Sequence, residues 1–66
     1  MHVKVNGEML ELEAGLPLGS LLERLGKQVA HVAVEHNGEI LDRDGIAATV
    51  LREQDRLEIV HFVGGG

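Results

Sequence analysis

The sequence contains no cysteine, no tryptophan and no tyrosine, and it has only one phenylalanine and one proline. Without cysteine, the chain has neither a disulfide to stabilise it nor a thiolate to act as a nucleophile or metal ligand. Because aromatic side chains are nearly absent, the core must consist of Leu, Val, Ile and Ala. An aliphatic core in a chain of 66 residues leaves little room for the deep pocket that ligand sites usually need, so an enzyme is not expected.

Basic residues are also scarce: six Lys and Arg stand against eleven Asp and Glu, for a formal net charge of −5. Nucleic-acid binding depends largely on phosphate contacts, so an acidic chain without a basic stripe is a poor candidate for it. No apolar run approaches the ~20 residues of a membrane span, and the N-terminus has no signal-peptide pattern. We therefore expect a cytoplasmic protein that binds neither nucleic acid nor membranes and is a monomer when free.

Alternating apolar residues on both sides of Asn6-Gly7 predict a β-hairpin over Val3–Glu13, because both central residues of a type I′ turn need positive φ. A second pair, Asn37-Gly38, follows the alternating Val32 and Val34 and predicts another hairpin that ends at Leu41.

Between the two hairpins, four leucines recur at helical spacing: Leu18, Leu21, Leu22 and Leu25. Pro17 suits the first helical turn, and Gly26 suits the left-handed position just past the helix end.

The second half is less regular. The charged residues 42–45 are interpreted as a solvated turn, and 46–51 is compatible with either a helical turn or a strand. The β-branched and aliphatic run 57–62 predicts a final strand. The resulting order, β-β-α-β-(short β)-β, predicts an α+β fold of the β-grasp type. Its mixed sheet of about five strands would pack against one main α-helix, with the first and last strands adjacent and parallel. We expect this domain to span residues 1–63.

Gly64, Gly65 and Gly66 follow the final strand and are expected to form a flexible tail, since glycine has no side chain to pack and much backbone entropy to lose. A frayed end is the simpler interpretation. Alternatively, the segment presents its terminal carboxylate to a partner enzyme. When fully extended, residues 63–66 reach roughly 13 Å beyond the fold, and glycine leaves the carboxylate unhindered. Such a carboxylate becomes an electrophile once adenylation supplies a good leaving group.

Other candidate sites carry weaker signals. The histidines lack metal-ligand spacing, and Asp42 and Asp44 lack the spaced ligands of a calcium loop, so no metal site is expected. Phe62 and Val63 directly precede the glycines. Phe62 is interpreted either as a core anchor or, with Val63, as a partner contact.

The whole chain resembles the ThiS family, the sulfur carriers of thiamine biosynthesis with a ubiquitin-like β-grasp fold. The segments that carry the resemblance are residues 5–8, 21–26, 34–40 and 55–66, of which the last, with its Val-Gly-Gly-Gly end, is the most specific. The chain departs from the family pattern at Pro17, where Thr often caps the helix, and at Gln54, where Gly often precedes the aspartate.

The resemblance implies a protein cosubstrate rather than a catalyst, without a permanently bound cofactor. An E1-like adenylyltransferase of the ThiF type would use ATP to adenylate Gly66. A cysteine desulfurase or another sulfur donor would then supply sulfur to form a Gly66 thiocarboxylate. A thiazole synthase of the ThiG type would accept that sulfur, with Gly64 and Gly65 entering the partner active sites alongside Gly66.

Three alternatives stay open. Carriers for molybdopterin synthesis and for tRNA thiolation end in the same way, although the chain length and the sequence 61–63 favour thiamine. A ubiquitin-like modifier would instead be conjugated to lysines through Gly66. A passive interaction domain would not use the glycines at all.

Overall fold

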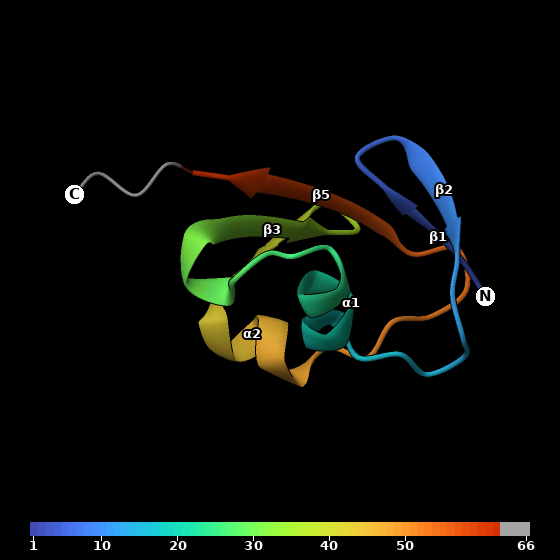
Figure 1. Ribbon diagram of the computed structural model, residues 1–66. Coiled ribbons are helices and arrows are strands. Elements are labelled where there is room, and N and C mark those ends of the chain that lie inside the picture. Colours follow the sequence, from blue (N-terminus) through green and yellow to red (C-terminus); the bar gives the residue numbers. More distant parts are fainter. Residues whose placement is uncertain (63–66) are drawn as a thin grey trace.

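The computed structural model describes residues 1–62 and, within them, five strands that form one mixed sheet in the order β2-β1-β5-β3-β4 (Figure 1). The expected domain boundary at residue 63 and the tail 64–66 lie outside the described residues. The elements, in chain order, are β1 (His2–Val5), β2 (Glu8–Glu11), α1 (Leu18–Arg24), the 3-10 helix η1 (Val29–His31), β3 (Val32–His36), β4 (Glu39–Leu41), α2 (Arg43–Ala48) and β5 (Arg56–His61).

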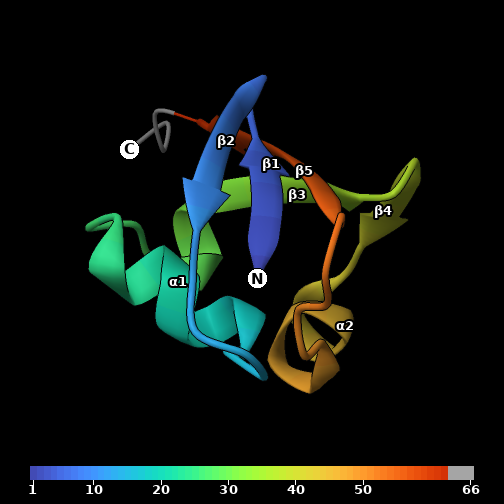
Figure 2. The same cartoon turned by 90° about the vertical axis from the view of Figure 1, so that its right-hand side faces the viewer.

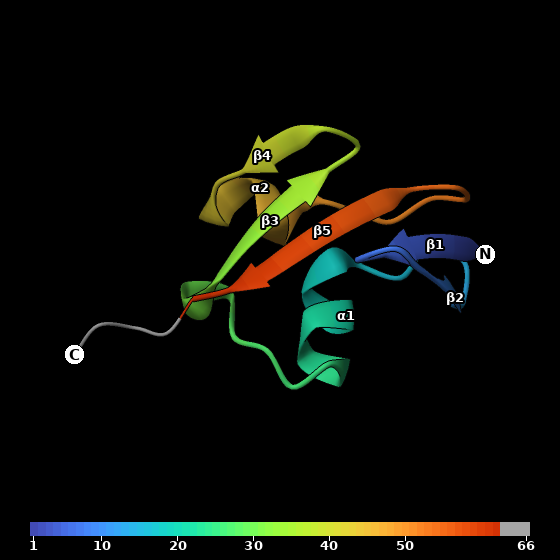
Figure 3. The same ribbon diagram turned by 90° about the horizontal axis from the view of Figure 1, so that it is seen from above.

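Strand β5 lies in the middle of the sheet, between β1 and β3 (Figure 3). It runs parallel to β1, with Lys4 opposite Arg56, and antiparallel to β3 over five residue pairs, from Val32 opposite His61 to His36 opposite Leu57. The predicted parallel pairing of the first and last strands is therefore confirmed, and so is the β-grasp arrangement.

The two Asn-Gly pairs form the predicted two-residue turns. Val5 pairs with Glu8 and His36 pairs with Glu39, which leaves only Asn-Gly in each loop. The φ angles are 49° and 82° in the first turn and 50° and 89° in the second, the positive values that a type I′ turn requires.

Helix α1 buries Leu18, Leu21 and Leu22, as its spacing predicts, but the fourth leucine, Leu25, is the C-cap of the helix and is exposed. Gly26 past the helix end has the expected left-handed φ of 71°. The placement of Pro17 in the first helical turn is wrong. Its ψ of 146° is extended, so Pro17 is the N-cap, and it forms an isolated β-bridge with Val50. That bridge, a contact between distant segments, holds Pro17 outside the helix.

The interpretation of residues 42–45 as a solvated turn is also wrong, because these residues begin helix α2. The Asp42 side chain caps the helix by accepting a hydrogen bond from the Gly45 backbone N–H at 2.7 Å. Capping of this kind satisfies a donor that the first helical turn leaves unpaired. Ile46 then points into the core, which resolves the ambiguity of the segment 46–51 in favour of a helix followed by the Val50 bridge.

Both α-helices pack on the same face of the sheet (Figure 2). The core between these layers is aliphatic, as the composition requires: among the described residues it consists of Val3, Val5, Leu16, Leu18, Leu21, Leu22, Val32, Val34, Ile46, Leu51, Leu57 and Ile59. The opposite face of the sheet has no helix over it in residues 1–62.

Candidate functional site

The C-terminal end of strand β5 lies at one end of the molecule (Figure 1). β5 pairs with β1 only at its first two residues, Arg56 and Leu57, whereas β3 accompanies it as far as His61. The backbone N–H of Phe62 then donates a hydrogen bond to the carbonyl of His31 at 3.0 Å. The last described residue is thus tied to the domain immediately before the segment 63–66.

The outer face of the sheet carries exposed apolar side chains near this end. Val60 is 60% exposed, Ile40 on β4 is 79% exposed, and Phe62, which continues the alternation of β5, is 47% exposed. Ala33 lies opposite Val60 in the β3–β5 pairing. We call Ala33, Ile40, Val60 and Phe62 the apolar strip. Phe62 therefore does not act as a core anchor, which leaves partner contact as the other interpretation that the sequence allowed.

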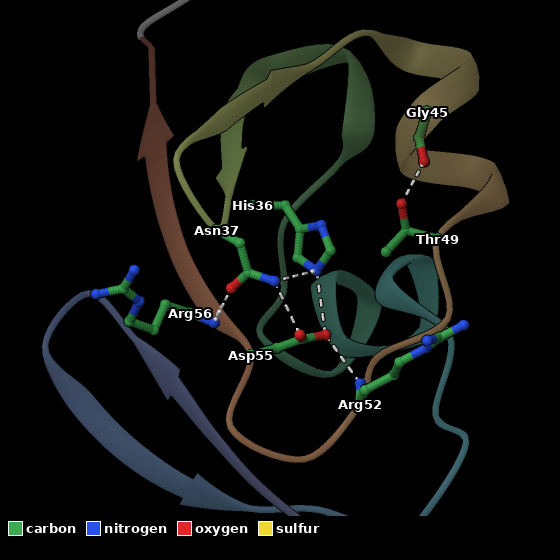
Figure 4. Close-up of polar contacts among 7 residues, drawn as sticks. All are labelled: His36, Asn37, Gly45, Thr49, Arg52, Asp55 and Arg56. Atoms are coloured by element: carbon green, nitrogen blue, oxygen red, sulfur yellow. Dashed lines mark hydrogen bonds and ion pairs between the residues drawn. The ribbon is translucent and has the colours of Figure 1, made fainter.

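The start of β5 is held by a cluster of polar contacts around Asp55, which is 7% exposed (Figure 4). One carboxylate oxygen lies 3.1 Å from His36 Nε2 and accepts a hydrogen bond from the Arg52 backbone N–H at 2.8 Å. The other oxygen accepts one from Asn37 Nδ2 at 3.0 Å, and Asn37 Oδ1 in turn accepts one from the Arg56 backbone N–H at 2.8 Å. The β3–β4 turn is thereby bound to the beginning of β5.

These contacts also set the ionisation of Asp55. Burial opposes the charged form, but the hydrogen bonds from Asn37, His36 and the Arg52 backbone outweigh it and lower the pKa of the Asp55 carboxyl below its ordinary value. Asp55 is therefore a carboxylate at neutral pH, with each of its oxygens hydrogen-bonded.

On the other side of β5, Asn6 makes a comparable contact. Its Oδ1 accepts a hydrogen bond from the Ile59 backbone N–H at 2.7 Å, and its Nδ2 donates one to the Ile59 carbonyl at 3.0 Å. The sequence does not reveal these roles of Asn6, Asn37 and Asp55, because the Asn-Gly pattern predicts a turn but not where the side-chain amide points.

The predicted site residues Gly64, Gly65 and Gly66, together with Val63, lie outside the described residues. Within residues 1–62, no three His, Asp or Glu side chains are grouped so that they could hold a metal ion. No helix in the same part of the chain is long and apolar enough to cross a membrane. Of the four histidines, His36 ends strand β3, and its partly buried side chain belongs to the Asp55 cluster.

The sheet order, the single face covered by helices and the central β5 define a ubiquitin-like β-grasp protein. Residues 3–66 match the ThiS family. The chain is also similar to the solved structure of a thiamine biosynthesis protein (ThiS) from Geobacter metallireducens, with a TM-score of 0.81 and 36% sequence identity over the full length of both chains. The chain belongs to the ThiS family.

Two curated relatives are larger proteins. The chain is 46% identical to a thiazole synthase from Magnetococcus marinus and 39% identical to one from Paramagnetospirillum magneticum, over all 66 residues in each case. It spans about a fifth of the length of both, since the alignments cover 20% of those proteins. In these relatives, a ThiS-like segment therefore belongs to the same polypeptide as the protein named thiazole synthase.

Proposed function

We propose that this protein carries sulfur in thiamine biosynthesis, as a thiocarboxylate on Gly66. The observation that carries the proposal is the match to the ThiS family over residues 3–66, because it includes the three C-terminal glycines as well as the β-grasp domain. The likeness to the Geobacter metallireducens ThiS protein, which extends over both chains completely, gives the same assignment independent support.

The chemistry of a terminal glycine suits this role. A carboxylate resists nucleophiles until one of its oxygens becomes part of a leaving group. In the proposed cycle, a Gly66 carboxylate oxygen attacks the α-phosphorus of ATP, pyrophosphate departs, and a sulfur nucleophile then displaces AMP. Glycine leaves the carbonyl carbon unhindered, and the absence of Cβ atoms in Gly64 and Gly65 lets that segment enter a narrow active site.

Partner enzymes supply the catalysis in this proposal. An E1-like adenylyltransferase of the ThiF type binds the ATP, a cysteine desulfurase or another donor provides the sulfur, and a thiazole synthase of the ThiG type accepts it. The relatives named thiazole synthase support the last of these partners, because two proteins joined in one polypeptide commonly act together. The carrier itself is a cosubstrate and binds no permanent cofactor.

Thiocarboxylate formation tests the proposal directly. The protein is incubated with a ThiF-type enzyme, ATP and a sulfur donor, and its intact mass is measured. We expect the mass gain that corresponds to one oxygen replaced by sulfur, and we expect fragmentation to place it on Gly66. Deletion of Gly66 is the matched control: it should abolish the gain and leave the melting temperature unchanged, since the core residues all precede Phe62.

The fate of the sulfur separates the alternatives. Loss of the thiocarboxylate on addition of a ThiG-type synthase and its small-molecule substrates supports the thiamine pathway. Transfer to a molybdopterin synthase or a tRNA-thiolating enzyme, but not to the thiazole synthase, would contradict it. Conjugation of Gly66 to lysines of other proteins would identify a modifier instead.

A further inference from the structure

The two Asn-Gly turns have nearly the same geometry but different chemical surroundings. Asn-Gly is chemically labile because glycine has no side chain to hinder its backbone nitrogen, which can attack the carbonyl carbon of the asparagine side chain. Asn6 and Asn37 share this sequence, a two-residue turn, and φ values of 49° and 50°. One chain thus contains two potential reaction sites that differ mainly in their neighbours.

The neighbours of the two amides are not alike. Both side-chain contacts of Asn6 are to backbone atoms of Ile59, and the residue before it is Val5. Asn37 instead follows His36, whose Nε2 lies 3.4 Å from Asn37 Nδ2 and 3.1 Å from the Asp55 carboxylate. The nitrogen that must leave in deamidation therefore has an imidazole beside it in one turn and no titratable side chain hydrogen-bonded to it in the other.

We propose that Asn37-Gly38 is a site of spontaneous deamidation, and that it reacts faster than Asn6-Gly7 because His36 supplies a proton to the departing nitrogen. The Gly38 nitrogen loses its proton to solvent and bonds to Asn37 Cγ. The Cγ–Nδ2 bond breaks, and Nδ2 leaves as ammonia with a proton from the His36 imidazolium. Water then opens the resulting succinimide to aspartate or isoaspartate, so the net change is hydrolysis of one amide.

The fold restrains this reaction without preventing it. Before Gly38 can attack, the Asn37 amide must leave the Arg56 backbone and Asp55. Strand β4 is a three-residue edge strand, paired to β3 at three positions, and its Ile40 is 79% exposed. Short edge elements of this kind open locally at a lower free energy than global unfolding requires. Because His36 directly precedes Asn37, it stays near the amide when the turn opens.

Deamidation of Asn37 would change its contact with the Asp55 carboxylate. Aspartate at position 37 would place a second carboxylate where Nδ2 now lies, 3.0 Å from an oxygen of Asp55. Two carboxylates at that distance do not both ionise without a large cost. Deamidation at Asn37 would thus separate the β3–β4 turn from the start of β5, whereas the same change at Asn6 faces only a backbone carbonyl.

Peptide mapping of the folded, full-length protein tests the proposal. Trypsin cleavage after Lys4 and Arg24 isolates Asn6, and cleavage after Lys27 and Arg43 isolates Asn37, so both sites are followed in one sample. We expect Asn37 to convert roughly tenfold faster than Asn6 at neutral pH, which is less than the hundredfold or more of a general acid held in an active site. Equal rates, a faster Asn6, or conversion of neither site would overturn the proposal.

The variant His36→Gln distinguishes two causes of fast deamidation at Asn37: proton donation by His36 and local opening of the turn. Gln can still donate a hydrogen bond to Asp55, but it has no proton to transfer at neutral pH. We expect conversion of Asn37 to slow to about the rate of Asn6, with Asn6 unchanged as the internal reference. An unchanged or faster rate at Asn37 would show that opening of the turn alone controls the reaction, and would overturn the role of His36.

Discussion

The side chain of Asn6 pairs with the backbone of Ile59 on both its donor and its acceptor side, at 3.0 and 2.7 Å. Strand β1 ends at Val5, and the Asn6 amide presents to β5 the same two groups that a further peptide unit of β1 would present. The turn residue thereby lengthens the parallel pairing between β1 and the central strand after the main chain has turned away.

We expect Asn6→Gly to lower the free energy of unfolding by about 2 kcal/mol, because two hydrogen bonds of about 1 kcal/mol each are lost. Glycine accepts the positive φ without strain, so the change isolates the amide. Urea unfolding measures the effect. The control is Glu8→Gln, a substitution at an exposed position beside the same turn, which should leave stability unchanged. Equal stability of Asn6→Gly and the parent would show that the contact contributes little.

Gln54→Gly should raise stability by about 0.5–1 kcal/mol. Gln54 has a φ of 70°, a left-handed conformation that costs a residue with a Cβ roughly 1–2 kcal/mol. Glycine avoids that cost but loses more entropy on folding, which reduces the gain. Thermal melting provides the measurement. Lys27→Gly, at a position where φ is not positive, is the control and should not stabilise.

Asp55→Asn should destabilise the protein at neutral pH but have a smaller effect in acid. The folded-state pKa of Asp55 is lowered, so its stabilisation is present above the unfolded value of about 3.9 and is lost as the pH falls through the folded value. Unfolding free energies of both proteins between neutral pH and pH of about 3 give the comparison. A difference independent of pH would mean that the charge of Asp55 is not what stabilises the cluster.

Leu22→Asp should unfold the protein. Leu22 is 1% exposed within the aliphatic core, and an unpaired buried charge costs several kcal/mol of a total near 5–15 kcal/mol. The exposed neighbour Glu23 offers a matched control, because Glu23→Asp introduces the same residue into the same helix. Circular dichroism with thermal melting should show a cooperative transition for the control alone.

Gly65→Val should block adenylation of Gly66 and leave the melting temperature unchanged. A β-branched residue restricts the backbone angles available inside a partner's active site. A displacement of about 1 Å from the reacting geometry can cost roughly a hundredfold in rate. The rate of adenylate formation by a ThiF-type enzyme measures this effect. A normal rate would show that the glycines do not enter a narrow site.

Local patterns predicted most of the elements correctly. The two Asn-Gly turns need positive φ, the leucines of α1 follow a helical period, and β5 is rich in β-branched and aliphatic residues, so each signal lies within a short stretch of chain. The start of helix α2 is interpreted from the sequence as a solvated turn, and its second half stays open between helix and strand, because only Asp42 and Ile46 distinguish this segment from a polar loop.

By itself, the sequence determined the aliphatic core, the turns, the helix face and membership of a family whose model matches residues 3–66. Only the tertiary structure decided the roles of Asn6, Asn37 and Asp55, because the contacts that join them to other strands and turns are made to residues 18 to 53 positions away along the chain. It also decided that Phe62 is exposed. Hydrogen bonds and burial between distant segments depend on how the strands are placed side by side, and a local pattern carries no information on that placement.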